Sequence, residues 1–393
     1  MPLFVILAAG CFVSSMAMRL VDPVVPDIAR DLHVSAASVA LLASAFTFPY
    51  ALGQPILGAL GDALGKARII KITLALLALC LAAGALAPSL DALYLARIIG
   101  GAAGGGVIPL AFAMVGDRFG MAERQVALSK VLTAIIAGQM TGSVGSGLIG
   151  STFGWRASMA AGTVLALIAL AVTVWQLQPR DHAERPPFQL RRMFDGYGEV
   201  FRNPRTAVCF TAVFIEGIVI FGLFPYVAVM LEERGAGGLR EAGLVLAGFA
   251  IGGLGYTVLV RVMLSRLGLY NVIRSGAAIS GLGFALLAPG WNWPVEMAIF
   301  VVIGLGFYMI HNSLQTQATE LAPDNRASAV AAHAFFFFLG QAVGPILYRF
   351  GQDHVGSQST LLAMAAVMAM LGFATAAGLQ ARTVSKAPTG SAP

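Results

Sequence analysis

The sequence predicts an all-α membrane protein with twelve transmembrane helices in two pseudo-symmetric six-helix bundles. Three observations carry this prediction. Of the 393 residues, 58% are hydrophobic and only 11% are charged, whereas soluble domains average about 25% charged residues. The apolar segments are numerous and long enough to cross a bilayer, and the two halves of the chain share short motifs. The net charge of +6 comes from short basic stretches between apolar segments, so we expect no nucleic-acid partner.

Twelve apolar segments of spanning length follow one another along the chain. We expect the first to be a true span, because it lacks the basic start of a signal peptide and ends in Arg19 and Asp22. The expected spans are residues 3–21, 38–60, 69–88, 92–115, 126–149, 155–177, 206–231, 242–264, 270–289, 294–318, 327–350 and 358–380.

The longest polar stretch, "QPRDHAERPPFQLRRMFDGYGEVFRNPR", separates six spans from six. The predicted organisation is therefore an N-terminal six-helix bundle, a cytoplasmic central loop, a C-terminal six-helix bundle and a disordered tail. Their boundaries are 1–177, 178–205, 206–381 and 382–393.

The distribution of Lys and Arg among the loops predicts the orientation. The loop after span two and the central loop are rich in basic residues, whereas the opposite side holds few, such as Arg30, Arg156 and Arg234. Because basic loops stay in the cytoplasm, we predict a multi-pass protein of the cell (inner) membrane with both termini cytoplasmic.

The halves repeat at an interval of about 202 residues. "GQMTG" at 138–142 returns as "GQAVG" at 340–344, and Pro23 matches Pro225. Each match alone is weak in a Gly-rich chain, but together they indicate duplication. Because each half holds an even number of spans, the repeat is parallel.

The loop after span two reads "GALGDALGKAR" and resembles the Gly-x-x-x-Asp-(Arg/Lys)-x-Gly-(Arg/Lys)-x-(Arg/Lys) motif of the major facilitator superfamily. It departs from this motif at Ala63. The resemblance implies the major facilitator fold and a cytoplasmic gate made by this motif. The gating residues would be Gly58, Asp62, Gly65, Lys66 and Arg68.

Two further stretches narrow the resemblance. "LARIIGGAAGG" is similar to the family's Arg-x-x-x-Gly motif at Arg97 and Gly101, and "RLVDPVVPDIA" is similar to the end of span one in the drug:proton antiporter and sugar-efflux branch. Antiporters of the family carry Gly-x-x-x-Gly-Pro in span five, where this chain has Ser143. This departure weakens the resemblance to the antiporters.

Small residues let membrane helices approach closely, so we expect helix packing and not ligand contact at a set of Gly and Pro positions in spans five, eight and eleven. In this fold, spans five and eight would meet at the seam between the halves. The set is Gly138, Gly142, Gly145, Gly248, Gly252, Gly255, Gly340, Gly344 and Pro345.

Polar residues recur at helical spacing inside spans one, two and ten, for example Tyr308, His311, Asn312 and Gln315. Such a face must meet water, a ligand or another helix, so an interhelical seam remains the alternative. The resemblance implies a central cavity lined by spans one, four, seven and ten. The expected substrate-binding residues are Arg19, Phe46, Gln54, Tyr226, Phe307, Tyr308, His311, Asn312 and Gln315.

Glu216 lies near the middle of span seven, where a charged side chain costs about 2.5–3.5 kcal/mol on insertion scales. A neutral acid that ionises when water reaches it would serve proton coupling. We therefore predict proton coupling by Glu216, Asp22 and Arg97, with Asp22 and Arg97 as a candidate ion pair. The alternatives are a fixed hydrogen bond for Glu216, a solvated helix end for Asp22 and a structural ion pair for Arg97. For His333 a structural role is favoured.

These residues predict a secondary active transporter that exports a small organic molecule, anionic or amphipathic, in exchange for protons. One alternative is a proton-coupled symporter for an organic anion, and another is a non-transporting membrane sensor or scaffold. The sequence indicates no enzyme, because it has no catalytic triad order, metal cluster or phosphate loop. We expect no cofactor or metal apart from the proton as coupling ion, and a monomer in the lipid bilayer.

Overall fold

The computed structural model describes residues 3–119, 121–177 and 197–384. All the regular structure in these ranges is helical. The first half contains α1 (Leu3–Arg19), η1 (Asp22–Val24), α2 (Val25–Asp31), α3 (Ala36–Ala40), α4 (Leu42–Leu64), α5 (Lys66–Ala85), α6 (Leu90–Gly104), α7 (Val107–Arg118), α8 (Met121–Met140), η2 (Thr141–Gly145), α9 (Ser146–Phe153) and α10 (Trp155–Gln176). The second half contains α12 (Thr206–Leu223), η3 (Phe224–Tyr226), α13 (Val227–Glu233), α14 (Leu239–Leu287), α15 (Trp293–Thr319), η4 (Pro323–Asn325) and α16 (Arg326–Val384).

Twelve spans are confirmed, although the described residues form ten continuous stretches of spanning length and composition. Two of these stretches each contain two spans, since α14 turns at Gly268 and α16 turns at Gly356. Both glycines have positive φ, 72° and 82°, which residues with a Cβ rarely adopt. A single residue therefore reverses the chain where a loop was expected.

The helices of the two halves are interrupted at equivalent positions. Gly154, between spans five and six, has φ 82° like Gly356, its equivalent 202 residues later. Pro23 and Pro225 each lie in a short 3₁₀ helix that interrupts spans one and seven. The repeat read from the sequence is therefore a repeat of backbone geometry.

The close contacts that glycines make between helices in the first half recur at equivalent positions in the second half. A Cβ on Gly138 would press on the carbonyl oxygen of Phe12, and one on Gly340 would press on that of Phe214, its equivalent. Gly142 and Gly344 are packed in the same way against the next turns of α1 and α12. These four glycines hold spans five and eleven against spans one and seven, as expected for small residues in membrane helices.

The glycines of spans five and eight differ in whether another helix packs against them. Gly248 and Gly252 pack against α15 of their own half. A Cβ added at Gly255 would have no neighbouring atom within 4 Å, and one added at Gly145 would meet only Thr141 of its own helix, at 3.7 Å. The packing role expected for Gly145 and Gly255 is not found. At the seam of spans five and eight the contact is made by Gly147, whose Cβ would lie 2.6 Å from the carbonyl oxygen of Leu239.

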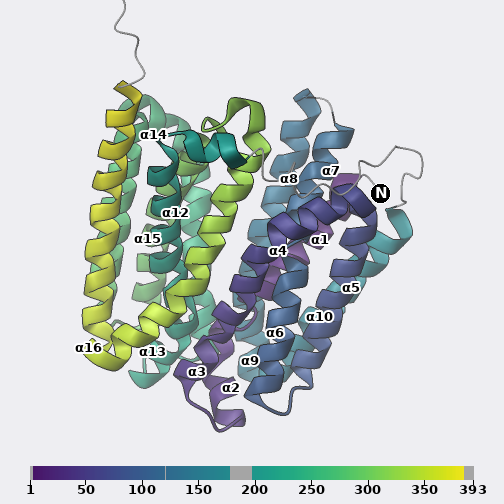
Figure 1. Ribbon diagram of the computed structural model, residues 1–393. Coiled ribbons are helices and arrows are strands. Elements are labelled where there is room, and N and C mark those ends of the chain that lie inside the picture. Colours follow the sequence, from purple (N-terminus) through teal and green to yellow (C-terminus); the bar gives the residue numbers. More distant parts are fainter. Residues whose placement is uncertain (1–2, 120, 178–196, 385–393) are drawn as a thin grey trace, which may run out of the picture.

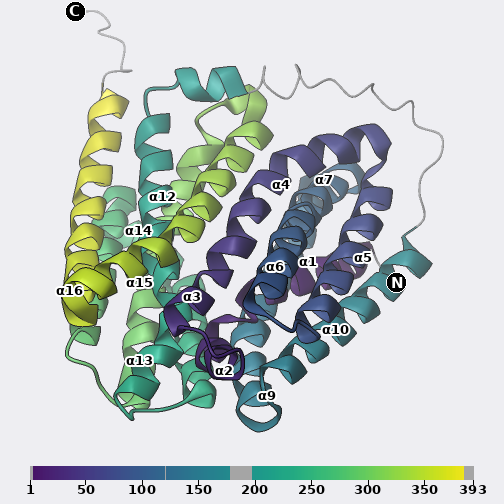
Figure 2. The same ribbon diagram turned by 60° about the horizontal axis from the view of Figure 1, so that its bottom comes forward.

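The two halves lie side by side, the first in purple to blue and the second in teal to yellow (Figure 1). At the end opposite the finish of α16, the short elements α2, α3 and α13 come together (Figure 2). The charge distribution predicts this end to be extracytoplasmic. Arg30 of α2 binds Glu232 of α13 there, with Nη1 2.5 Å from Oε2, so an ion pair joins the halves at this end.

Two predicted segments fall partly outside the described residues. Of the central loop, residues 178–196 lie outside them, and residues 197–202 form a helical segment. Of the predicted tail, residues 385–393 lie outside them, whereas α16 continues through Arg382 to Val384.

Span five contains an unexpected irregularity. Residues Thr141–Gly145 form a π-helical turn, and Ser143 lies at its centre. Such turns insert one extra residue into the helix and leave its hydrogen-bond ladder locally irregular. The break is located where the antiporter motif would place a proline.

Candidate functional site

Glu216 lies on α12 and is completely buried. Its Oε2 atom is 3.0 Å from Nδ1 of His311 on α15. The other oxygen, Oε1, has no hydrogen-bond partner among the described residues. The hydrogen bond persists whichever of the two side chains carries the proton, because the carboxyl can donate to the ring nitrogen and the ring can donate to the carboxylate.

A second histidine lies behind the first. The ring of His333 on α16 has its centroid 5.4 Å from that of His311. Its Nε2 atom is buried without a hydrogen-bond partner in the described structure. Phe307 stacks on His311 at 5.0 Å, and Phe337 lies 4.4 Å from the same ring. Three titratable groups therefore meet inside an aromatic wall.

The duplicated scaffold shows that this cluster is specific to the second half. Because Phe12 matches Phe214 in the glycine contacts, the position equivalent to Glu216 in the first half is Ser14. The Ser14 hydroxyl donates a hydrogen bond of 3.0 Å to the carbonyl oxygen of Gly104. The same place in the fold is thus structural in one half and carries an acid in the other.

A separate charged cluster joins the halves. Arg19 at the end of α1 is buried and donates a hydrogen bond to Gln341 Oε1 of α16. Its guanidinium lies 4.3 Å from the ring centroid of Phe221, a cation–π geometry. Its Nη1 atom is 3.6 Å from Asp22 Oδ2. The direct ion pair of Asp22 is thus with Arg19, whereas Arg97, the expected partner, interacts with Asp22 only at longer range.

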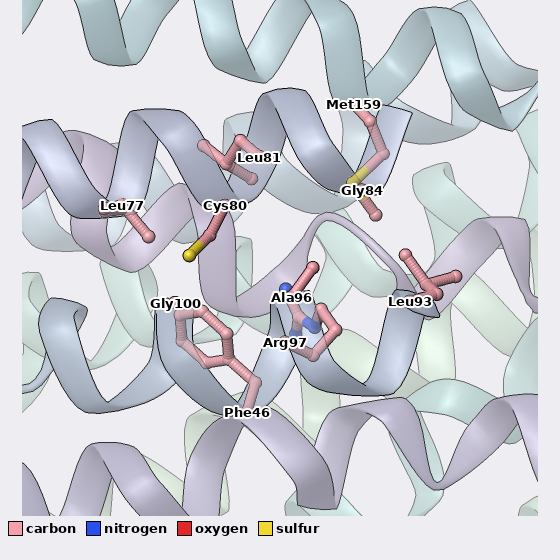
Figure 3. Close-up of a pocket in the computed structure, with 10 residues that line it drawn as sticks. All are labelled: Phe46, Leu77, Cys80, Leu81, Gly84, Leu93, Ala96, Arg97, Gly100 and Met159. Carbon is pink, nitrogen blue, oxygen red and sulfur yellow. The ribbon is translucent and has the colours of Figure 1, made fainter. Parts of the chain in front are cut away.

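Arg97 is bound to the backbone. Its guanidinium donates to the carbonyl oxygens of Ala17 at 2.6 Å, Met18 at 3.2 Å and Leu42 at 3.4 Å. It also lies 4.1 Å from the ring centroid of Phe46, and Figure 3 shows the two side chains as neighbours. The carbonyls at the end of a helix lack helical partners, so Arg97 closes the broken end of α1.

The pocket beside Arg97 and Phe46 is narrow. Its walls come from α4, α5, α6 and α10 of the first half, and Cys80 faces Phe46 across it (Figure 3). The space left inside is about that of one water molecule. This pocket does not accommodate an organic substrate.

Several expected substrate-binding residues lie apart from the Glu216 cluster. The Tyr226 hydroxyl donates to the carbonyl oxygen of Pro345 at 2.8 Å, at the junction of η3 with α16. Asn312 lines a groove between α14 and α15 with Tyr256 and Thr316. Gln54 is buried in α4 and Gln315 is half-buried in α15. Of the expected set, Phe307, Tyr308 and His311 are closest together: the ring of Phe307 is 5.0 Å from both others.

The loop motif is anchored within the first half. Gly65 has φ 99° and separates α4 from α5. Lys66 Nζ is 2.6 Å from Asp117 Oδ2 at the end of α7. Arg68 is exposed, a Cβ added at Gly58 would meet open space, and the side chain of Asp62 lies outside the described residues. Gating by this motif stays a prediction.

Some residues of the site were missed or given little weight. Gln341 lies in the repeated "GQAVG", which was used only as a sign of duplication. Phe337 belongs to the "FFFF" run that follows His333, and a long apolar run gives no signal of which ring faces a titratable group. Phe221 gave no signal either, because it lies in a uniformly apolar span.

The comparison with protein families decides the identity of the fold. The family model described as Major Facilitator Superfamily matches residues 7–345. The chain belongs to this superfamily.

Related members of the superfamily include resistance proteins. Multidrug resistance protein 2 of Bacillus subtilis (strain 168) is 23% identical over 351 residues, which cover 88% of this chain and 87% of that protein. Tetracycline resistance protein, class C, of Escherichia coli is 27% identical over 347 residues, 85% of each chain. These relatives agree with the resemblance to the drug:proton antiporter branch of the superfamily.

Solved structures of superfamily members share the fold. The nucleoside transporter NupG has a TM-score of 0.75 at 18% identity and covers 97% of this chain and 100% of its own. The human organic anion transporter MFSD10 has a TM-score of 0.69 at 16% identity, with 95% and 98% covered. Its membership of the superfamily makes the chain a multi-pass membrane transporter of a small molecule and not an enzyme.

Proposed function

We propose that this transporter exports a small organic molecule in exchange for protons, and that Glu216 carries the coupling proton. The observation that carries the proposal is the environment of Glu216. It is the acid near mid-depth of a span, it is fully buried, and one of its oxygens has no partner in the described structure. A charged carboxylate in such a place is costly, so the acid is stable there in its neutral form.

Alternating access can couple transport to protons, because it changes whether water reaches the buried carboxyl of Glu216. When the site is sealed from water, the neutral acid is favoured, and when water enters from one side, the carboxylate is solvated and the proton leaves. The bond to His311 Nδ1, which both protonation states keep, holds the carboxyl in place during the exchange. A carrier must load and unload the same group on opposite sides, and this arrangement meets that need.

The direction and the class of substrate rest on the relatives and on the aromatic wall. Proteins named for multidrug and tetracycline resistance are similar to this chain over most of its length, and export of a drug is the way in which a membrane transporter would give resistance. Phe221, Phe249, Phe307 and Phe337 form a connected cluster of rings next to Glu216. This cluster suits an apolar or aromatic body.

Symport of an organic anion has less support. An anionic substrate needs a cation with free hydrogen-bond donors. Arg97 is engaged with three backbone carbonyls, and Arg19 binds Asp22 and Gln341. In this conformation both guanidinium groups already have partners, although Nε of Arg19 makes no hydrogen bond in the described structure.

The test is transport in proteoliposomes under an imposed pH gradient, with a panel of metabolites and drugs that includes tetracycline. In Glu216→Gln, an amide replaces the acid at nearly the same volume. We expect this variant to lose accumulation against the substrate gradient, down to the level of empty liposomes, while it retains downhill exchange.

The matched control is Glu296→Gln. Glu296 is also a buried glutamate of the second half, but its Oε1 is bound to Arg234 at 2.7 Å. A general penalty for replacing a buried glutamate would affect both variants, whereas coupling should be lost only in Glu216→Gln. If Glu216→Gln still concentrates a substrate, proton coupling at this residue is excluded.

A further inference from the structure

Arg19 lies between partners from both halves of the protein. We infer that it is a two-position latch. It binds Gln341 and two phenylalanine rings of the second half while the extracytoplasmic end is closed, and it pairs with Asp22 of its own half when that end opens. This role does not depend on which residue carries the proton, and it makes Gln341 a positioning residue for Arg19.

The halves are in contact at the extracytoplasmic end. There η1 contacts η3 and α13 of the other half, α2 contacts α13, and α9 contacts α14. Figure 2 shows α2, α3 and α13 together at this end. Transporters of this superfamily work by alternating access, in which the two halves rock against each other. The contacts at this end must therefore be given up in another conformation.

Three groups of the second half hold the guanidinium of Arg19. Its Nη2 atom donates a hydrogen bond to Oε1 of Gln341 on α16. Its central carbon lies 4.3 Å from the ring centroid of Phe221 in α12 and 5.1 Å from that of Phe224 in η3. Arg19 is only 3% exposed, so water does not replace a bond that is lost here while the end stays closed.

The ion pair of Arg19 with Asp22 is incomplete in this conformation. Nη1 of Arg19 is 3.6 Å from Oδ2 of Asp22, whereas a charge-assisted hydrogen bond has a length of about 2.7–2.9 Å. Both carboxylate oxygens of Asp22 and the Nε atom of Arg19 are buried without a hydrogen-bond partner in the described structure. A buried carboxylate without hydrogen bonds is costly. A movement of the guanidinium by about 1 Å completes the pair, so the second position is within reach.

The duplication shows how the two halves divide these groups. At the repeat interval of 202 residues, Phe221 and Phe224 are the equivalents of Arg19 and Asp22. The first half therefore supplies both charges, and the second half supplies two rings at the same places. The second half binds Arg19 through uncharged groups, which the carboxylate of Asp22 can replace once the halves part.

The latch adjoins the Glu216 site. Phe221 lies five residues beyond Glu216 toward the extracytoplasmic end, and its ring is 5.4 Å from that of Phe307 and 5.5 Å from that of Phe337. These two rings lie against the histidine that binds Glu216. While Arg19 holds Phe221, the ring layer between Glu216 and the extracytoplasmic end stays in place.

The ion pair of Arg30 with Glu232 also joins the halves at this end, but it lies on the surface. The side chains of Arg30 and Glu232 are 58% and 26% exposed, and exposed ion pairs contribute little to stability. We therefore expect the buried contacts of Arg19, and not this pair, to decide whether the end is closed.

The experiment measures the separation of the halves in the purified full-length protein. The native cysteines are buried, so spin labels are attached at Asp91→Cys in the first half and Glu233→Cys in the second, two exposed positions at the extracytoplasmic end. Distances are recorded by double electron–electron resonance in lipid nanodiscs, without substrate or a pH gradient. In Gln341→Leu we expect the population with longer distances to increase at least threefold, because Arg19 loses its hydrogen-bond acceptor in the closed conformation.

The matched control is Gln139→Leu. Gln139 is the equivalent of Gln341 in the first half and is half-buried in α8, so this variant makes the same exchange without touching the latch. It should leave the distances unchanged. Phe221→Leu removes the ring over Arg19 and keeps an apolar side chain, and it should increase the longer distances as Gln341→Leu does.

A combined variant tests the second position of Arg19. Asp22→Asn, added to Gln341→Leu, should return the longer distances to the native level, because an uncharged amide no longer stabilises the open conformation. Distances that neither Gln341→Leu nor Phe221→Leu alters, or an equal shift in Gln139→Leu, overturn the latch. Longer distances that persist in the combined variant overturn the pairing with Asp22. All these results leave the proposed role of Glu216 intact, since that role is tested under a pH gradient.

Discussion

The crossing of α14 and α15 provides a sharp test of how the spans are held together. Gly252→Ala places a methyl group against the carbonyl oxygen of Val301, 2.6 Å from the backbone nitrogen of Leu305 and 3.0 Å from the carbonyl carbon of Gly304. Ordinary van der Waals contact begins near 3.4 Å. The helices must therefore part by about 1 Å, which forfeits a quarter to a half of each dispersion contact along the crossing.

We expect Gly252→Ala to lower the free energy of unfolding by about 1–3 kcal/mol, the usual cost of overpacking. Gly255→Ala is the matched control in the same helix, because nothing lies within 4 Å of the position its new Cβ would take. Removing a mid-helix glycine without a clash should stabilise by about 0.5–1 kcal/mol. The assay is unfolding by SDS titration in detergent micelles, followed by circular dichroism. Equal losses in both variants would refute the assignment of this crossing.

Three further predictions concern other parts of the protein. Arg97→Lys should lower the melting temperature in detergent, because a lysine ammonium lacks the planar fork that serves several carbonyls at once; an unchanged melting temperature would contradict the proposed closing of α1. A double-mutant cycle of Lys66→Ala and Asp117→Ala should give a coupling of about 0.2–1 kcal/mol in unfolding, and a coupling of several kcal/mol would show a stronger anchor. Reporter fusions at residue 190 and after residue 236 should report opposite sides of the membrane, and a common side for both would disprove the twelve-span topology.

The fold was predictable because bilayer physics leaves few alternatives. Apolar segments of spanning length must be helices, and the glycine and proline matches at an interval of 202 residues gave the duplication. The limits of individual spans were less certain. Gly268 and Gly356 reverse the chain without a loop, and a lone glycine in a Gly-rich sequence gives no sign of its backbone angles.

The candidate site was predictable where burial alone identifies a residue. Glu216 stood out because an acid at that depth is costly, and His311 because it lies on a polar helix face. Contacts across the fold were not predictable. Arg97 was expected near Asp22 from similar depth, but the broken end of α1 offers carbonyl oxygens that only the three-dimensional structure places around it.

The π-helical turn at Thr141–Gly145 changes what the absence of a proline means. Ser143 stands where the antiporter motif has its proline, yet the helix is irregular at that place, and a Cβ added at Gly243 in the other half would lie 3.0 Å from the Ser143 carbonyl oxygen. The helix of span five is thus irregular at the position of the motif's proline although no proline stands there. A search for the proline alone therefore overlooks chains whose fifth span is irregular at this turn for another reason.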